Sequence, residues 1–156
     1  MSSNLTLGTK SIMKILISGH RKSKLQNYSM GFIKDALYLI LVDKDVIGLS
    51  GMADGIDLMF CETLLEQGKG YHCYIPFEGQ EDYMSAIDRH HREALISRAW
   101  KVHKVRNSAM VENCDSGIIV WDGNKGGTHN VFQQMIEVGK EFTWIDPVNE
   151  RVIEVK

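Results

Sequence analysis

The residues best placed to do chemistry follow a short apolar run in the last third of the chain. Residues 118–120 are β-branched and predict a strand buried on both faces. A turn with Gly126, Gly127 and Thr128 follows, and a helical pattern of apolar residues begins at Val131. Glycines let a backbone approach a ligand closely, and the first N–H groups of a helix favour an anion. The pattern indicates a phosphate or carboxylate site, although an ordinary strand-to-helix turn also uses glycine for its dihedral angles.

A basic loop follows the first predicted strand. It contains Ser18, Gly19, His20 and Arg21 and continues with two lysines to residue 24. Open α/β sheets bind ligands at the carboxyl ends of their strands, which is where this loop lies. The loop therefore predicts counter-charges for an anionic ligand, and the alternative is a solvated run of charge.

A second strand-to-helix turn has the same character. Ser50, Gly51 and Gly55 form the turn, and Asp54 and Asp57 lie at the start of the next helical pattern. Either aspartate can cap that helix. In a ligand site, they are better suited to a sugar hydroxyl, a base donor or Mg²⁺ than to a phosphate, which they would repel. We assign no cofactor, and Mg²⁺ is the candidate.

Strands and helices alternate along the chain and position these turns. Strands are predicted at residues 13–17, 46–49, 71–75, 118–120 and 142–146, with a short strand within 100–105 and an edge strand or tail at 148–156. Helices are predicted at residues 28–43, 56–68, 85–100 and 106–113 and from Val131 onward. The third helix is predicted to turn Ile87, Leu95 and Ile96 inward. The alternation predicts a Rossmann-like, doubly wound α/β fold with a mainly parallel five-stranded sheet and an extra C-terminal edge strand as an option.

The composition suits one globular domain. The chain has 156 residues, of which 44% are hydrophobic and 24% are charged. We expect residues 1–11 to be a flexible leader and residues 12–156 to form a single domain. The net charge of −2 gives no general attraction to nucleic acid or to an anionic membrane. Three dispersed cysteines favour reduced thiols in the cytoplasm, and no apolar run approaches the ~20 residues of a membrane span.

Four motifs, taken in order, give the chain a resemblance to a known family. They are ILISGHR, LSGMADGID, YIPFEGQ and RNSAMVENCDSGIIVWDGNKGGT. These motifs resemble those of the SLOG superfamily, which includes DprA and the LOG cytokinin-activating enzymes, and within it the YspA/YpsA-like Rossmannoid proteins. The resemblance runs from about Met13 to Pro147, and it implies a nucleotide or a nucleotide-derived ligand.

The resemblance also implies roles for individual residues. The family's first glycine turn matches residues 50–57, its phosphate-binding turn matches residues 126–128, and a basic–polar pair matches Arg106 and Asn107. LOG enzymes cleave the N-glycosidic bond of nucleoside monophosphates and carry a glutamate three residues after the threonine, where this chain has Val131. The difference removes the family's usual acid. The candidates to replace it are Asp54, Glu112 and Asp122.

Three functions are compatible with these residues. The first is a module that senses or sequesters a nucleotide, and the second is a hydrolase or transferase acting on a nucleotide's N-glycosidic or phosphate bond. The third is DprA-like binding of single-stranded DNA, which the acid-leaning charge disfavours. We expect a homodimer or a larger homo-oligomer and no membrane partner. The predicted ligand-binding residues are Ser18, Gly19, His20, Arg21, Ser50, Gly51, Asp54, Gly55, Asp57, Pro76, Arg106, Asn107, Asp122, Gly126, Gly127 and Thr128.

Overall fold

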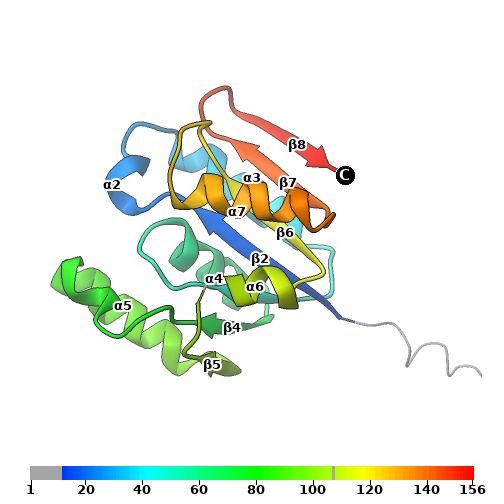
Figure 1. The fold of residues 1–156 in the computed structure, drawn as a ribbon. Coiled ribbons are helices and arrows are strands. Elements are labelled where there is room, and N and C mark those ends of the chain that lie inside the picture. The colour runs from blue at the N-terminus through cyan, green and yellow to red at the C-terminus, as the bar shows by residue number, and fades with distance from the viewer. Residues whose placement is uncertain (1–11, 107) are drawn as a thin grey trace, which may run out of the picture.

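The structure is a computed structural model that describes residues 12–106 and 108–156. The predicted leader, residues 1–11, and the predicted ligand-binding residue Asn107 lie outside the described residues. Within the described part, helices cover both faces of a mostly parallel sheet (Figure 1). The α/β fold class predicted from the alternation of strands and helices is confirmed.

The sheet is built around the first strand of the chain. Within the described residues, its strands are β2 (Met13–Gly19), β3 (Val46–Ser50), β4 (Gly70–Tyr74), β5 (Lys101–His103), β6 (Ser116–Val120), β7 (Phe142–Asp146) and β8 (Arg151–Val155). Their order is β5-β4-β3-β2-β6-β7-β8, and β7–β8 is the antiparallel pair. The short strand predicted within residues 100–105 is β5, and the edge strand predicted within residues 148–156 is β8; these two form the edges of the sheet. Since β3 and β6 flank β2, the order of the strands reverses at β2.

Within the described residues, the long helices agree in number with the prediction and differ from it at their ends. They are α2 (Lys22–Leu25), α3 (Met30–Leu41), α4 (Ile56–Glu66), the 3₁₀ helix η1 (Gln80–Tyr83), α5 (Ala86–Ser97), α6 (Ser108–Asn113) and α7 (Gly127–Glu137). α7 begins four residues earlier than Val131, because Gly127 and Thr128 already belong to its first turn. The prediction that Ile87 faces the core is wrong, since 81% of this residue is exposed.

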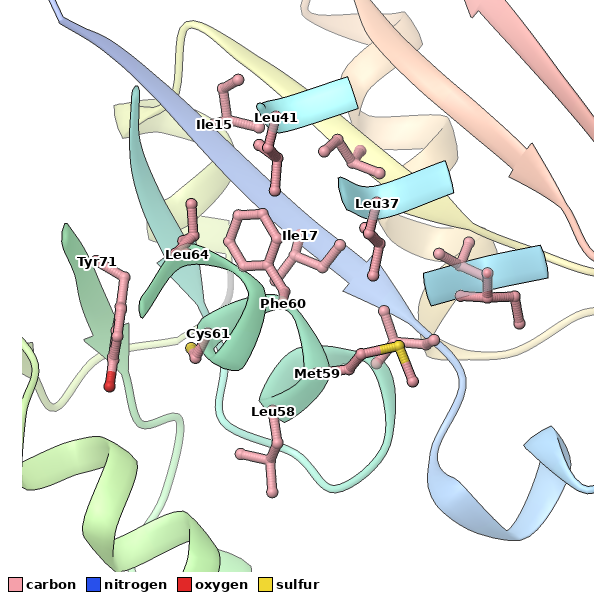
Figure 2. Close-up of a cluster of buried hydrophobic side chains, with 14 of the residues drawn as sticks. Ile15, Ile17, Leu37, Leu41, Leu58, Met59, Phe60, Cys61, Leu64 and Tyr71 are labelled. Carbon is pink, nitrogen blue, oxygen red and sulfur yellow. The ribbon is translucent and has the colours of Figure 1, made fainter. Parts of the chain in front are cut away.

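Two hydrophobic layers hold the sheet between the helices. On one face, Ile15 and Ile17 of β2 pack with Leu37 of α3 and Phe60 of α4, as Figure 2 shows. On the other face, Leu16 of β2 packs with residues of α6 and α7. The alternation follows from the two-residue period of a strand, which sends neighbouring side chains to opposite faces. Both layers therefore depend on the same central strand.

Helix α4 lies directly on the backbone of the sheet. A Cβ atom at Gly48 would lie 2.3 Å from Cδ1 of Leu64 and 2.5 Å from Cε2 of Phe60, and one at Gly19 would lie 2.5 Å from Cβ of Ile56. Both positions must therefore be free of a side chain. This close packing brings the N-terminus of α4 to the carboxyl ends of β2 and β3.

Candidate functional site

A pocket of about 360 Å³ opens where the strand order reverses, at the carboxyl ends of β2, β3 and β6. We call it the switch-point pocket. Its lining comprises Ile17, Ser18, Gly19, His20, Arg21, Ser23, Lys24, Ala53, Asp57, Met110, Asn124, Lys125, Gly126, Gly127, Thr128 and Val131. Ligands of open α/β sheets occupy this position, because the turns on either side of the reversal separate and leave a crevice.

The structure brings half of the predicted ligand-binding residues to this pocket. They are Ser18, Gly19, His20, Arg21, Asp57, Gly126, Gly127 and Thr128. Other predicted residues fall outside its lining: Ser50, Gly51, Asp54, Gly55, Pro76, Arg106 and Asp122. Of these, Pro76 lines a different cavity of about 460 Å³ at the end of β4, and Arg106 is exposed on the surface. The catalytic candidate Glu112 is also exposed and outside the lining.

The start of α7 supplies the pocket with backbone donors. No side chain of the described residues caps this helix, and its first turn contains no acidic residue. The preceding Gly126 has a φ of 151°, a conformation that favours glycine. Added Cβ atoms at Gly126 and Gly127 would meet no protein atom within 4 Å, so both face open space. The first N–H groups of α7 and the positive end of its dipole are thus available to an anion.

Three cationic side chains line the same pocket. Arg21 and Lys24 come from the segment after β2, and Lys125 comes from the turn before α7. Among the described lining residues, Asp57 is the acidic one. The pocket is therefore locally basic, although the chain as a whole carries a formal charge of −2.

Asp57 is a buried carboxyl in the wall of the pocket. Its Oδ2 accepts a hydrogen bond of 3.1 Å from the N–H of Ala53, and the residue is 9% exposed. Burial raises the pKa of Asp57 to about 7, the charge of Asp54 adds to this effect, and the hydrogen bond from Ala53 opposes it. Near neutral pH this carboxyl can therefore donate as well as accept a hydrogen bond. Neither Asp54 nor Asp57 caps α4, whose N-cap residue is Gly55.

Asp122 fixes the turn that leads to α7. Its Oδ2 accepts from the Tyr28 hydroxyl at 2.8 Å, and its Oδ1 accepts from the N–H of Asn124 at 2.9 Å. Burial raises its pKa, but the hydrogen bonds from Asn124 and Tyr28 and the nearby His20 outweigh burial and lower the pKa overall. Since both carboxylate oxygens already accept hydrogen bonds, Asp122 serves mainly to shape the turn.

His20 supports the same turn as a neutral imidazole. It is 5% exposed, and burial lowers its pKa despite the attraction of Asp122. Its Nε2 accepts a 3.0 Å hydrogen bond from the backbone N–H of Asp122, which requires an unprotonated Nε2. The 3.3 Å approach of Nε2 to Oδ1 of Asp122 is therefore not an ion pair. His20 joins the ends of β2 and β6 beside the pocket.

Arg21 lies at the rim of the pocket between a carboxylate and an aromatic ring. Its Nε is 3.7 Å from Oδ1 of Asp54, and its Cζ is 3.7 Å from the centroid of the Tyr83 ring. Oδ1 of Asp54 is buried and has no hydrogen-bond partner among the described residues, so the Arg21 charge balances it without a hydrogen bond. The Arg21 side chain is 53% exposed and remains accessible to a ligand.

Two further properties of the described residues bear on ligands. No group of three or more His, Cys, Asp or Glu side chains in residues 12–106 and 108–156 could hold a metal ion. No helix in the same residues combines the length and apolarity needed to cross a membrane.

The lining adds two polar residues that sequence reasoning missed, Asn124 and Lys125, and two that the predicted basic loop includes but the list of ligand-binding residues omits, Ser23 and Lys24. Each lies within a few residues of a predicted one. The signal in the sequence that could have identified them is that they lie in the same two segments as the predicted residues, after β2 and before α7. The short helix α2, which sets the positions of Ser23 and Lys24, has too few residues to show a periodic pattern.

The fold matches that of a solved protein of known name. The X-ray structure of DNA processing protein A (DprA) from Streptococcus pneumoniae superposes with a TM-score of 0.61 and 17% sequence identity, over 85% of this chain and 50% of that protein. The chain thus spans half the length of this structural neighbour, and the likeness shows the shared Rossmann-like fold. No protein-family model matches the sequence, and no curated protein matches it.

Proposed function

We propose that the chain binds the phosphate of a nucleotide or nucleotide-derived ligand in the switch-point pocket, as a sensor or sequestering module. The observation that carries the proposal is the meeting of the uncapped start of α7 with Arg21, Lys24 and Lys125 in one pocket. Backbone donors and cations converging on one point suit the several oxygens of a phosphate. We also propose that the chain is a SLOG protein near the YspA-like branch, as its four motifs and the DprA-like fold suggest.

The rest of the pocket suits the uncharged part of such a ligand. Its volume of about 360 Å³ lies within the usual range for small-molecule sites, about 300–1,000 Å³. Ile17, Met110 and Val131 give it apolar surface, and Asp57 offers a carboxyl to a sugar hydroxyl or a base donor. In this arrangement, the turn before α7 binds the phosphate, and the turn after β3 binds the sugar or the base.

Val131 in the lining favours binding over N-glycosidic hydrolysis. Cleavage builds positive charge on the sugar, which a nearby carboxylate would stabilise. Val131, at the position where the LOG pattern has glutamate, lines the pocket and is 9% exposed. We therefore expect no fast release of free base from nucleoside monophosphates. Release at about 1–10 s⁻¹, an ordinary enzymatic rate, would replace the binding module with a hydrolase.

A thermal-shift screen over nucleotides, cyclic nucleotides and ADP-ribose tests the proposal. A ligand at 100 times its Kd adds about 2.7 kcal/mol to the free energy of unfolding, which is roughly 5–10 °C in Tm for a chain of this size. Lys125→Ala should lose most of this shift, and Lys101→Ala, an exposed lysine of β5 outside the pocket, should keep it. Absence of a shift with every phosphate compound would contradict the proposal.

Binding of a single-stranded DNA end is a second candidate, because the structural neighbour is named as a DNA processing protein. The observation that favours it is Tyr83, which is 47% exposed beside the pocket rim with Arg21 against its ring. Aromatic rings and arginines together stack bases in sequence-tolerant sites. Fluorescence anisotropy with labelled oligonucleotides tests this. DNA binding predicts a logarithmic salt slope of about −0.7 per phosphate contact, and mononucleotide binding predicts no gain with oligonucleotide length.

We further propose that the protein acts in the cytoplasm as a homodimer or larger homo-oligomer. Within the described residues, β5 and β8 are the edge strands of the sheet, and an exposed strand edge can pair with another chain. Size-exclusion chromatography with light scattering tests the oligomer, and a monomer at micromolar concentration would contradict it.

A further inference from the structure

The turn after β3 contains a strained backbone at Met52, whose φ is 59°. Residues with a Cβ atom rarely adopt this left-handed conformation, and Met52 is also completely buried. Such a conformation persists where the surrounding contacts determine it, and it is common beside ligand sites. The contacts that hold Met52 therefore identify the residues on which this turn depends.

Part of the support comes from the pocket side. Oγ of Ser50 accepts a 3.2 Å hydrogen bond from the N–H of Met52 and donates one of 3.2 Å to the carbonyl of Asp57. Oδ2 of Asp57 accepts from the N–H of Ala53, and both of these residues line the switch-point pocket. These hydrogen bonds join the turn after β3 to the first turn of α4.

Further support comes from two side chains behind the turn. Nε2 of Gln80 donates to the carbonyl of Gly51 at 2.8 Å, and Nε of Arg92 donates to the carbonyl of Met52 at 3.1 Å. Nη2 of Arg92 also donates to Oε1 of Gln80 at 2.8 Å, and the Glu81 carboxylate lies 4.0 Å from Nη1. Gln80 and Arg92 are 5% and 3% exposed, and neither lines the switch-point pocket.

Gln80 and Arg92 do more than fill the volume behind the turn, because their polar groups form directed hydrogen bonds. Burying a guanidinium is unfavourable unless its donors are satisfied, and an apolar side chain could fill the same volume. The planar fork of arginine instead fixes the direction of several hydrogen bonds at once. We infer that Arg92 and Gln80 are positioning residues, which hold the turn in the conformation that places the Asp57 carboxyl in the wall of the ligand pocket. The inference rests on the proposed function in taking this pocket as the ligand site.

Titration of Asp57 reports the position of the turn without any ligand. The groups that influence or border it are Asp54 in the same turn, Cys61 in α4, Tyr83 in η1 and Arg21, which pairs with Asp54. Burial is the main reason for its pKa of about 7. If the turn relaxes, water reaches the carboxyl and its pKa falls toward the ordinary value of about 3.9.

The test is an NMR titration of the Asp57 carboxyl carbon in the free protein. In Arg92→Lys, which keeps the charge and loses the fork, we expect the Asp57 pKa to fall by about one pH unit or more. The double variant Arg92→Met/Gln80→Leu should show the same direction in an apolar background. Removing a positive charge by itself would raise the pKa, so the sign separates positioning from electrostatics. Arg89→Lys, an exposed arginine of the same helix, is the matched control.

Isothermal titration with adenosine 5′-monophosphate is the second measurement. We expect Arg92→Lys to weaken its Kd about tenfold, the scale of one lost hydrogen bond, with Arg89→Lys unchanged. An unchanged Asp57 pKa in either folded Arg92 variant would overturn the inference, whether or not the nucleotide binds. Failure of the wild-type chain to bind any phosphate compound would instead overturn the proposed ligand site.

Discussion

At the scale of single residues, Gly127 offers the most direct test of whether the switch-point pocket binds an anion. We predict that Gly127→Asp abolishes nucleotide binding, because the new carboxylate would lie at the helix terminus that should meet the phosphate. A Cβ here meets no protein atom within 4 Å, so the variant should fold. An acidic residue at a helix start even adds about 0.3–1 kcal/mol of stability.

For this variant, isothermal titration should therefore show a loss of nucleotide affinity, whereas thermal unfolding should show unchanged or slightly higher stability. Gly127→Ala is the matched control, since it adds the Cβ without the charge and should retain most of the affinity. Full nucleotide affinity in folded Gly127→Asp would show that the phosphate does not bind at the start of α7.

Asp57 makes a second prediction at this scale, on the pH dependence of stability. Its pKa is about 7 in the folded chain, against an ordinary value of about 3.9. The folded state therefore favours the protonated carboxyl, and this contribution is complete below about pH 4 and is lost as the pH rises to about 7. Asp57→Asn cannot ionise, so its stability relative to wild type should rise by roughly 2–4 kcal/mol between pH 4 and pH 8. Urea unfolding at both pH values measures this, and a constant difference would show that the buried carboxyl ionises freely.

Single residues also mark how far the sequence alone can lead. The two glycine turns and the basic loop are local patterns, and half of the predicted ligand residues meet in one pocket. Lys24 joins them from the basic loop, and Lys125 joins them because the turn after β6 carries it there, which the local pattern does not encode. Pro76 follows β4 and Arg106 follows β5, neither of which borders the pocket. The sequence cannot tell which strand ends lie side by side.

At the scale of elements, the packing of α4 on β3 predicts opposite effects for two glycine substitutions. Gly48→Ala places a Cβ 2.3 Å from Leu64, so the helix must shift, and we expect a loss of about 1–3 kcal/mol in the free energy of unfolding. Gly31→Ala lies in α3, with Oγ of Ser29 as its nearest contact at 3.9 Å, and should gain about 0.5–1 kcal/mol. Chemical denaturation of the two variants compares them. Equal stability would mean that α4 does not rest on the β3 backbone.

The ends and faces of elements are where sequence patterns fail. The apolar period places the start of the last long helix at Val131, because the glycines and Thr128 before it carry no apolar stripe, yet they form its first turn. In α5 the buried face passes through Arg92, which reads as a surface residue in any hydrophobicity pattern. Ile87 lies away from that face and is exposed. Tertiary hydrogen bonds, which the sequence does not display, decide this orientation.

At the scale of the whole molecule, both hydrophobic layers share β2, so we predict that the described domain unfolds in one step. Tryptophan fluorescence reports chiefly on the α7 side, where Trp121 stacks on His129 and packs against Trp144, because the third tryptophan, Trp100, is already 60% exposed in the folded chain. Far-ultraviolet circular dichroism reports on all helices. The two signals should give coincident urea transitions, in the wild type and in Gly48→Ala alike. A separate, earlier fluorescence transition would mean that the α6–α7 layer forms an independent unit.

The central place of β2 also has a consequence for the protein during its synthesis. Among the described strands, β2 is synthesised first and β3 next, so that Met13 can pair early with Val46, whereas the partner on the other side of β2 begins only at Ser116. Until then one edge of β2 is open to unwanted pairing with other nascent chains. The pocket-lining residues Gly126, Gly127 and Thr128 are synthesised after β6. Because these pocket residues follow β6 in the chain, the switch-point pocket is completed only after this open stage, and the yield of correctly folded copies depends on how quickly translation delivers β6.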